Sequence, residues 1–266
     1  MSSNPKPLIP LNTCKRKLQS GANVVGTFVI EIRQPAVMQF LANAGFDFVL
    51  IDNEHGAFSI ETIADLSRSA VLLGLTPIVR IPEINHANIC QTLDVGAQGL
   101  MVPQITSADQ VRWVVENMHY PPKGSRGNAM ERGLTQFLSG SVPQGLEDIQ
   151  REMMLVIQVE TFEAIDAIDE IVSLPGVDAA LIGPNDLSIA LGVPGEVDHP
   201  SVKQAIQKTI QACLRAGVAP AIHMPRLELA AYWARQGMRM ISTGSEAAFM
   251  VRAGKASVET LRSAFS

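Results

Sequence analysis

The chain has 266 residues, of which 47% are hydrophobic and 18% are charged, and its formal net charge is −5. This length suits a single eight-stranded α/β barrel or a protein of two domains. Because the charge is spread out and no basic run occurs, we expect neither nucleic acid nor a membrane as a partner, and a small anionic ligand would need a local positive centre.

We expect residues 1–22 to form a lead-in with one short helix between Asn12 and Ser20, and residues 23–266 to form one domain. After the lead-in, short apolar runs alternate with amphipathic stretches. The predicted strands are Val24–Ile30, Phe46–Asp52, Thr76–Ile81, Gly99–Gln104, Met153–Val159, Val177–Ile182, Val218–His223 and Met238–Thr243. The predicted helices are Pro35–Ala44, Ser59–Leu73, Asn85–Val95, Ala108–Asn117, Phe162–Val172, Ser201–Ala216, Leu227–Gln236 and Glu246–Arg262.

Eight strand–helix units in succession indicate a parallel sheet of the α/β class, and their even spacing favours closure into a (β/α)₈ barrel. Glycine stands where five of the helices should end, which is typical of a left-handed C-cap. These glycines are Gly45, Gly74, Gly96, Gly217 and Gly237.

One interval interrupts the alternation. Between Tyr120 and Arg151 the sequence is rich in proline, glycine and serine, and we expect irregular chain there. A loop of this length in a compact domain is usually a lid, a binding loop or an interface.

The cysteines and the N-terminus indicate the cellular compartment of the protein. Cys14, Cys90 and Cys213 are far apart and fall in no metal-binding or redox motif, which favours reduced thiols in a cytoplasmic protein. The N-terminus lacks the apolar region of a signal peptide, and no apolar run is long enough to span a membrane.

In a barrel of this kind the carboxyl ends of the strands form the active face. Polar residues end most of the predicted strands and should share one rim. They are Asp52-Asn53-Glu54-His55, Arg80, Gln104, Gln158 with Glu160, Asn185-Asp186, His223 and Thr243-Gly244-Ser245.

Two carboxylates on neighbouring strand ends suggest a metal site. Alternation along the fifth strand places Glu160 on the same side as Gln158, and Asp186 follows the sixth strand. Such oxygen ligands suit Mg²⁺ or Mn²⁺, which keep positions open for a chelating substrate. Two alternatives remain open: Asn185 or Asp186 only caps a helix, or Glu160 forms an ion pair with Arg80 without any metal.

The same rim offers groups for proton transfer and oxyanion binding. His55 can exchange a proton near neutral pH, although a structural histidine is the alternative. Arg80 is suited to an oxyanion or carboxylate, unless it only pairs with Asp52 or Glu54. Asp94 lies at a helix C-terminus, where the macrodipole disfavours an anion, so either a partner elsewhere holds it or it is solvated. None of the seven lysines lies at a strand end, which argues against Schiff-base chemistry.

Taken together, the motifs resemble those of the HpcH/HpaI family of metal-dependent (class II) pyruvate aldolases, from about Asn23 to Phe249. They are Asp52-Asn53-Glu54-His55, Val79-Arg80-Ile81-Pro82, Leu93-Asp94-Val95-Gly96-Ala97, Tyr120-Pro121-Pro122-Lys123-Gly124-Ser125-Arg126-Gly127, Gln158-Val159-Glu160-Thr161 and Gly183-Pro184-Asn185-Asp186-Leu187-Ser188. The resemblance implies a (β/α)₈ barrel and a homo-hexamer, built as a trimer of dimers with C-terminal helices exchanged between subunits.

The resemblance also implies roles for single residues. Glu160 and Asp186 would hold the divalent metal, with Mg²⁺ as first choice and Mn²⁺ or Co²⁺ as alternatives. His55 would be the base and Arg80 would stabilise the developing enolate. Gln158, with the backbone at Asn185 and Asp186, would hold the pyruvyl group. Asp94 of an adjacent subunit would raise the basicity of His55.

The resulting hypothesis is reversible cleavage of a 4-hydroxy-2-oxo acid into pyruvate and an aldehyde through a metal-stabilised pyruvate enolate. One alternative keeps that enolate but decarboxylates oxaloacetate or cleaves an acyl-CoA. Another is a barrel that binds a 2-oxo acid without catalysis. The chain departs from the family at Asn128-Ala129-Met130-Glu131, where small residues usually follow Arg126-Gly127, and this bears on the aldehyde side of the pocket.

Overall fold

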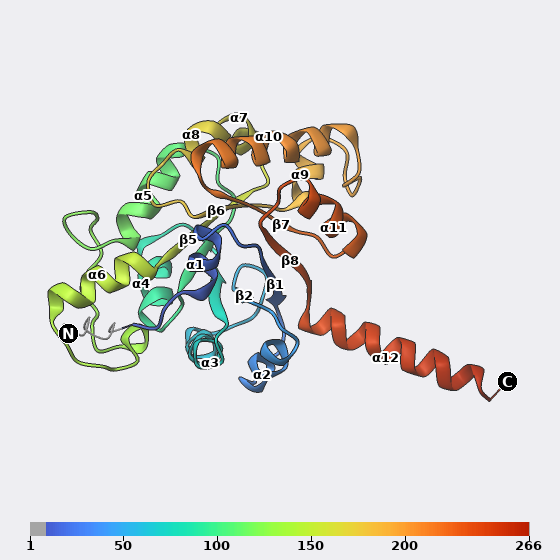
Figure 1. Cartoon of the computed structure of the whole chain (residues 1–266), viewed down its shortest axis with the longest axis horizontal. Helices are drawn as coiled ribbons and strands as arrows, with labels where there is room; N and C mark the ends of the chain where they lie inside the picture. Colours follow the sequence, from blue (N-terminus) through green and yellow to red (C-terminus); the bar gives the residue numbers. More distant parts are fainter. Residues whose placement is uncertain (1–8, 266) are drawn as a thin grey trace.

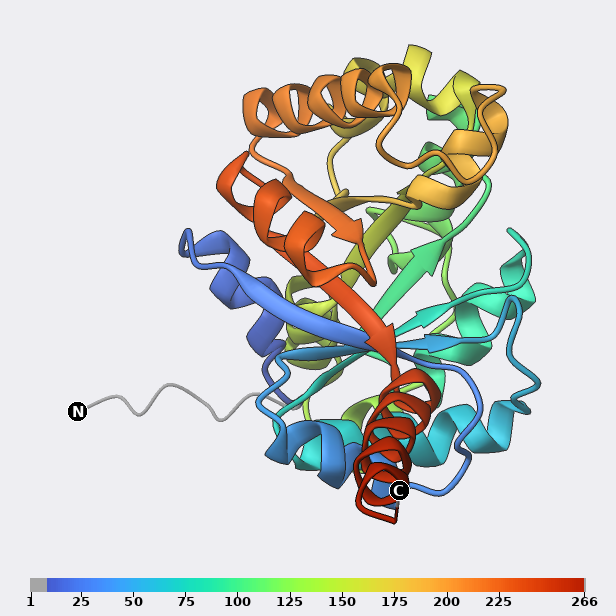
Figure 2. The same ribbon diagram turned by 90° about the vertical axis from the view of Figure 1, so that its right-hand side faces the viewer.

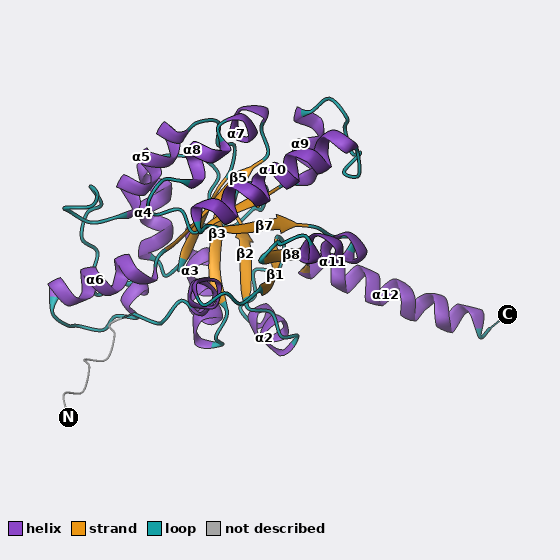
Figure 3. Cartoon of the chain, turned by 45° about the horizontal axis from the view of Figure 1, so that its top comes forward, coloured by secondary structure: helices purple, strands orange, loops and turns teal. Residues whose placement is uncertain are grey.

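Eight parallel strands close into a barrel in chain order, and the last strand pairs with the first to complete it. The computed structural model of the protein describes residues 9–265. Its strands are β1 (Val24–Val29), β2 (Phe48–Asp52), β3 (Thr76–Arg80), β4 (Gly99–Val102), β5 (Met154–Val159), β6 (Ala179–Ile182), β7 (Ala219–His223) and β8 (Met240–Ser245). Figure 3 shows these strands enclosed by the helices. The predicted (β/α)₈ barrel is therefore confirmed.

The helices follow the predicted alternation with small shifts at their ends. They are α1 (Thr13–Gln19), α2 (Ala36–Asn43), α3 (Ile60–Leu72), α4 (His86–Asp94), α5 (Ala108–Met118), α6 (Val142–Glu152), α7 (Phe162–Asp166), α8 (Ile168–Val172), α9 (Pro184–Ala190), α10 (Pro200–Ala216), α11 (Leu227–Arg235) and α12 (Glu246–Ser263), with a 3₁₀ turn η1 (Gly133–Thr135). The five glycines predicted as C-caps all have positive φ, between 72° and 121°.

Two predictions about the helices are wrong. The interval from Tyr120 to Arg151 is not irregular throughout, because it contains η1 and most of α6. The buried face of α6 includes Asp148 and Glu152, so its pattern lacks the apolar stripe by which a helix is recognised in a sequence. The single helix expected over Phe162–Val172 is interrupted at Ala167 and forms α7 and α8.

Side chains that alternate along the strands fill the barrel interior. On β2, Phe48 and Leu50 belong to the interior cluster, and Asp52 at the next inward position reaches the rim. Gly26 on β1 leaves room for the Phe48 ring, because a Cβ at this position would lie 2.4 Å from a ring carbon. Apolar layers therefore support the polar residues at the mouth from below.

Helix α1 packs against the opposite end of the barrel. Its Cys14 and Leu18 are buried within the interior cluster. The residue before the helix, Asn12, is fully buried: its side chain accepts a hydrogen bond from the backbone N–H of Lys15 and donates to the carbonyls of Gln98 and Glu152. The division of the chain after residue 22 stays a prediction, although α1 and the barrel share one core.

The last helix, α12, extends away from the barrel beyond the end of β8 (Figures 1 and 2). Its main contacts with the strands are made to β1 and β8, and its Phe249 stacks on Phe46 with the ring centres 5.9 Å apart. Along its free length it exposes Met250, Val251 and Leu261, and Phe265 just beyond its end is 85% exposed. Within residues 9–265, none of the helices combines the length and hydropathy needed to cross a bilayer.

Replacing Asn12 by alanine should lower the free energy of unfolding by about 2–4 kcal/mol, since the change removes an N-cap and leaves two buried carbonyls short of a donor. Urea denaturation at pH 7 measures this change. Asn43→Ala, at an exposed position of α2, is the matched control and should cost less than about 0.5 kcal/mol. Equal stability of the two variants would contradict the anchoring role of Asn12.

Candidate functional site

A cavity of about 340 Å³ opens at the carboxyl ends of the strands. This volume is in the range of small-molecule sites. Residues from all eight strands or the turns after them line it, together with Ala248 of α12. The lining residues are Phe28, Ile30, Asp52, His55, Arg80, Met101, Gln158, Leu181, Gly183, Pro184, Asn185, Asp186, His223, Pro225, Gly244, Ser245 and Ala248.

Asp52 and Arg80 form a buried, two-pronged ion pair across β2 and β3. The Arg80 Nε and Nη2 atoms lie 2.9 and 2.6 Å from the two carboxylate oxygens of Asp52, and the two residues are direct partners in the strand register. Burial would raise the pKa of Asp52, but the hydrogen bonds and positive charge of Arg80, together with the backbone N–H groups of His55 and Glu54, outweigh burial and hold the pKa below its usual value. Asp52 is therefore ionised at neutral pH and fixes the guanidinium.

The same carboxylate holds the loop that carries His55. The Oδ1 atom of Asp52 accepts the backbone N–H groups of Glu54 and His55 at 3.0 and 3.2 Å. Glu54 lies 3.0 Å from Arg80 Nη1, and its pKa is raised by burial although Arg80 acts in the opposite direction. The His55 side chain is 73% exposed at the edge of the cavity, with its Nε2 atom 3.9 Å from Glu54.

Glu160 is buried just beyond β5 and faces inward with Gln158. Its carboxylate accepts the backbone N–H of Gln104 at 3.0 Å and the amide of Gln158. Gln104 adopts a positive φ of 54°, an uncommon conformation for a residue with a side chain, and its N–H is directed at Glu160. The alternative ion pair between Glu160 and Arg80 does not form, because Arg80 pairs with Asp52 and Glu54.

Burial raises the pKa of Glu160 above its usual value. The hydrogen bonds from Gln104 and Gln158 oppose this shift, whereas the negative charges of Asp186 and Glu54 add to it. A buried carboxylate surrounded by other carboxylates is stable in its ionised form only beside a cation.

Gly183 marks the place where two carboxylates and an amide converge. A Cβ atom on Gly183 would lie 3.2 Å from Glu160 Oε2, 3.5 Å from Gln158 Nε2 and 3.8 Å from Asp186 Oδ2. Asp186 is in the first turn of α9, and the first hydrogen bond of that helix runs from Leu187 N to Gly183 O. The absence of a side chain at Gly183 therefore leaves a space bordered by oxygen ligands.

These residues fit a divalent ion of the magnesium type. Glu160 and Asp186 supply hard oxygen ligands, and the Oε1 atom of Gln158 is buried without a hydrogen-bond partner. No group of three or more His, Cys, Asp or Glu side chains suited to a metal was found in the part of the chain that the structure describes. Water or a bound ligand would have to complete the coordination of an ion held by two carboxylates, as is usual for Mg²⁺.

Asp94 is not part of this cavity within one chain. It ends α4, so it lies toward the amino ends of the strands, and its carboxylate pairs with the buried guanidinium of Arg126. Arg126 also stacks over the ring of Tyr120, 5.0 Å from its centre. The expected partner of this helix-end anion is therefore Arg126, and the role of Asp94 beside His55 of another subunit stays a prediction.

Two further residues border the site without any role having been assigned to them from the sequence. His223 ends β7 and lines the cavity, where its Nδ1 atom lies 3.0 Å from Ser242 Oγ. Glu246 begins α12, and its buried carboxylate accepts the backbone N–H groups of Ile30, Glu31 and Ile32 at 2.7–3.1 Å. The position of His223 at a predicted strand end was a sequence signal that it lies at the site. No local sequence feature indicates the contacts of Glu246.

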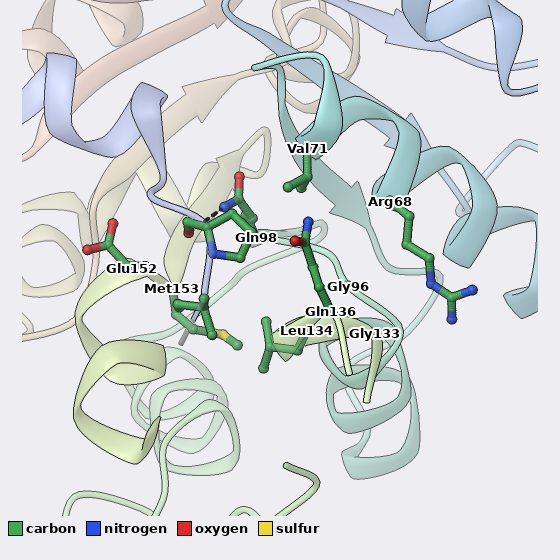
Figure 4. A pocket seen from close by; sticks show the side chains of 11 residues that line it. Arg68, Val71, Gly96, Gln98, Gly133, Leu134, Gln136, Glu152 and Met153 are labelled. Carbon is green, nitrogen blue, oxygen red and sulfur yellow. Dashed lines mark hydrogen bonds between the residues drawn. The ribbon is translucent and has the colours of Figure 1, made fainter. Parts of the chain in front are cut away.

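A second cavity, shown in Figure 4, lies away from this rim, between the segment before α1, α3 and η1. Its volume is about 20 Å³, enough for a single water molecule. Most of its lining is apolar or backbone, and the Gln98 amide there donates to the carbonyl of Pro10. It is too small for a metabolite. The cavity at the strand carboxyl ends is the candidate active site because Asp52, Arg80, Gln158, Asp186 and His223 line it together.

Comparison with known proteins agrees with this location. A family model described as HpcH/HpaI aldolase/citrate lyase matches residues 26–253. A hydroxypyruvate/pyruvate aldolase from Delftia acidovorans is 33% identical over 255 residues, which make up 96% of this chain and 94% of the relative. A 4-hydroxy-2-oxo-heptane-1,7-dioate aldolase from Shigella sonnei is 32% identical over 247 residues, 92% of this chain and 93% of the relative.

The fold is also similar to a solved one. The crystal structure of an HpcH/HpaI aldolase from Desulfitobacterium hafniense aligns with a TM-score of 0.89 and 31% sequence identity. The alignment covers 93% of this chain and 96% of the other.

Gly183→Ala should weaken the binding of Mn²⁺ about 10- to 100-fold while the fold is kept, since the new methyl group would lie 3.2 Å from Glu160 Oε2 and displace that carboxylate. Titration followed by electron paramagnetic resonance measures the affinity, and circular dichroism checks the fold. Gly254→Ala is the control, because a Cβ on Gly254 meets nothing within 4 Å. The same Mn²⁺ affinity in both variants would show that the ion does not bind beside Gly183.

Proposed function

This chain belongs to the HpcH/HpaI aldolase/citrate lyase family, and from this premise we propose that it reversibly cleaves a 4-hydroxy-2-oxo acid into pyruvate and an aldehyde. The names of the two relatives above, both aldolases, support this reaction. The observation that carries the proposal is the convergence of Glu160 and Asp186 at Gly183. Gly183 and Asp186 line the same cavity as Arg80 and His55.

We propose that Glu160 and Asp186 hold a divalent ion, with Mg²⁺ as the first choice and Mn²⁺ or Co²⁺ as alternatives. The raised pKa of Glu160, caused chiefly by burial, and the space at Gly183 support this assignment. When bound, such an ion supplies a Lewis acid for the carboxylate and the 2-oxo group of the substrate.

Arg80 provides a positively charged side chain at the cavity, in addition to the charge of the proposed metal ion. Its guanidinium is held by Asp52, lies over the Phe28 ring at 5.1 Å and lines the cavity. When the bond between C3 and C4 breaks, its electron pair moves toward the 2-oxo oxygen and negative charge develops there. A preorganised guanidinium stabilises such charge without reorganising during the reaction.

His55 is the proposed base. Its backbone is fixed by Asp52, and its exposed imidazole stands at the edge of the cavity. In the cleavage direction it takes the proton of the C4 hydroxyl, the bond between C3 and C4 breaks, and C4 becomes the aldehyde carbon. The C3 of the enolate then gains a proton to give pyruvate. Asp94 of a neighbouring subunit is proposed to raise the basicity of His55.

The pyruvyl group is proposed to lie beside Gln158 and the start of α9. Gln158 lines the cavity and is held by its contact with Glu160. The backbone N–H groups of Asn185 and Asp186 precede the first hydrogen bond of α9, so they are available to an anionic ligand.

We also propose a homo-oligomer, a hexamer built as a trimer of dimers, in which α12 packs on another subunit. The helix leaves its own barrel (Figure 1). It exposes apolar side chains along its length. A contiguous exposed apolar face of this kind is typical of an interface.

The cytoplasm is the proposed compartment. Cys14, Cys90 and Cys213 are free thiols, and burial raises the pKa values of Cys14 and Cys213, which keeps them in the unreactive thiol form.

Purified protein supplied with Mg²⁺, Mn²⁺ or Co²⁺ should release pyruvate from 4-hydroxy-2-oxo acids, measured by coupling to lactate dehydrogenase. His55→Ala should lower kcat by about 10²- to 10⁴-fold, because it removes the general base. His199→Ala is the control, since His199 caps α10 outside the cavity. Absence of pyruvate with every ion, or an undiminished rate in the His55 variant, would count against the proposal.

Replacing Met250 and Leu261 together by glutamate should reduce the particle from a multiple of 28.6 kDa to a single chain, since charges cannot be buried in an apolar contact. Light scattering after gel filtration measures the mass. Lys255→Ala, also exposed on α12, should leave the mass unchanged. A wild-type protein of 28.6 kDa would refute the proposed assembly.

A further inference from the structure

His223 is a cavity-lining group that the proposed mechanism does not use. It ends β7, and its Nδ1 atom lies 3.0 Å from the Oγ of Ser242, its register partner on β8. The edge of the Phe28 ring meets the imidazole, with the two ring centres 4.7 Å apart and the planes at 87°. The imidazole is therefore held in a defined orientation.

The protonation state of His223 suits a hydrogen bond with an uncharged partner. Burial, with the nearby charge of Arg80, lowers its pKa to about 4, so the imidazole is uncharged at neutral pH. A neutral imidazole has one ring nitrogen that donates and one that accepts. Because Nδ1 is engaged by Ser242, Nε2 is the nitrogen left for a ligand.

The cavity divides into sectors by strand. The proposed base and the guanidinium come from β2 and β3, and the two carboxylates follow β5 and β6. His223 belongs to the remaining sector, formed by β7, β8 and β1, which lines the same cavity. A pyruvyl group held between Gln158 and Arg80 leaves that sector to the other fragment of the substrate, beyond C4.

The charges of the lining favour an uncharged fragment there. Among the described residues that line the cavity, Arg80 alone carries a permanent positive charge, and it already faces Asp52 and Glu54. A carboxylate on the aldehyde fragment would find no free cation among the described residues that line this cavity. A hydroxyl group, in contrast, can pair with an uncharged imidazole.

We infer that His223 is a specificity-determining residue: its Nε2 atom forms a hydrogen bond with a hydroxyl group of the aldehyde fragment, so that the enzyme prefers hydroxylated aldehydes to alkyl aldehydes of the same length. This inference rests on the proposed aldolase function. It adds the chemical class of the aldehyde and names the side chain that selects it.

The test compares two aldehydes that differ by one hydroxyl group, 2-hydroxypropanal and propanal. Each is used as the acceptor in the aldol addition of pyruvate. The ratio of their kcat/KM values measures the preference. His223→Leu should lower this ratio roughly threefold to tenfold, the range of one neutral hydrogen bond. His223→Gln, which keeps a donor and an acceptor, should restore part of it. Ser242→Ala should lower the ratio less than His223→Leu does, since it removes only the partner of Nδ1.

His199→Leu is the matched control, because the Nδ1 atom of His199 also pairs with a serine, Ser201 Oγ at 2.8 Å, outside the cavity. Its ratio should equal that of the wild type. A ratio that is unchanged in His223→Leu, or that falls equally in His199→Leu, overturns the inference. If His223→Leu does not fold, the Ser242→Ala and His223→Gln ratios decide, and wild-type values in both overturn it.

A separate measurement on the wild-type protein distinguishes failure of the inference from failure of the proposed function. Exchange of the pyruvate methyl protons in D₂O, followed by nuclear magnetic resonance, reports enolate formation without any aldehyde. No exchange refutes the aldolase proposal itself. Exchange together with an unaltered aldehyde preference refutes only the role of His223.

Discussion

Asp52 holds Arg80 by two hydrogen bonds at the barrel mouth, and the same carboxylate accepts the backbone N–H groups of Glu54 and His55. One side chain thus sets the position of the guanidinium and of the loop that carries the imidazole. The pair is buried, so water does not compete for it, and removing one partner would leave an uncompensated charge. The spacing of the two groups is set by this contact, by the ion pair of Glu54 with Arg80 and by the pairing of β2 with β3.

The other half of the site is built on an electrostatic conflict. Glu160 is buried, Asp186 and Glu54 add negative charge, and a residue with positive φ, Gln104, directs its N–H at the carboxylate. Packing alone would favour an amide or an apolar side chain at position 160. A carboxylate kept there against desolvation is a feature of functional sites, where a ligand supplies the missing charge.

The repetitive part of this structure could be predicted from the sequence because it is encoded locally. Alternation along β5 placed Gln158 and Glu160 on one side, and glycines marked five helix ends. Helix α6 could not be recognised, since its buried face includes the polar Asp148 and Glu152, and Glu152 is satisfied in part by Asn12 and Arg16, which lie far away in the sequence. The pairing of Arg80 with Asp52 or Glu54 was one alternative from the sequence, and both pairs form. The hold of Asp52 on the loop that carries His55 and the positive φ of Gln104 were not predicted, because they arise only in the folded chain.

Glu246 gives the exposed helix a connection to the catalytic cavity. Its carboxylate receives three consecutive N–H groups of the chain after β1, including that of Ile30 in the cavity wall, while its own backbone begins α12. The first residue of α12 is therefore hydrogen-bonded to the cavity wall. Any rotation of α12 that moves the Glu246 carboxylate must either move the chain after β1 with it or break these hydrogen bonds, so the position of α12 and the shape of the cavity are coupled.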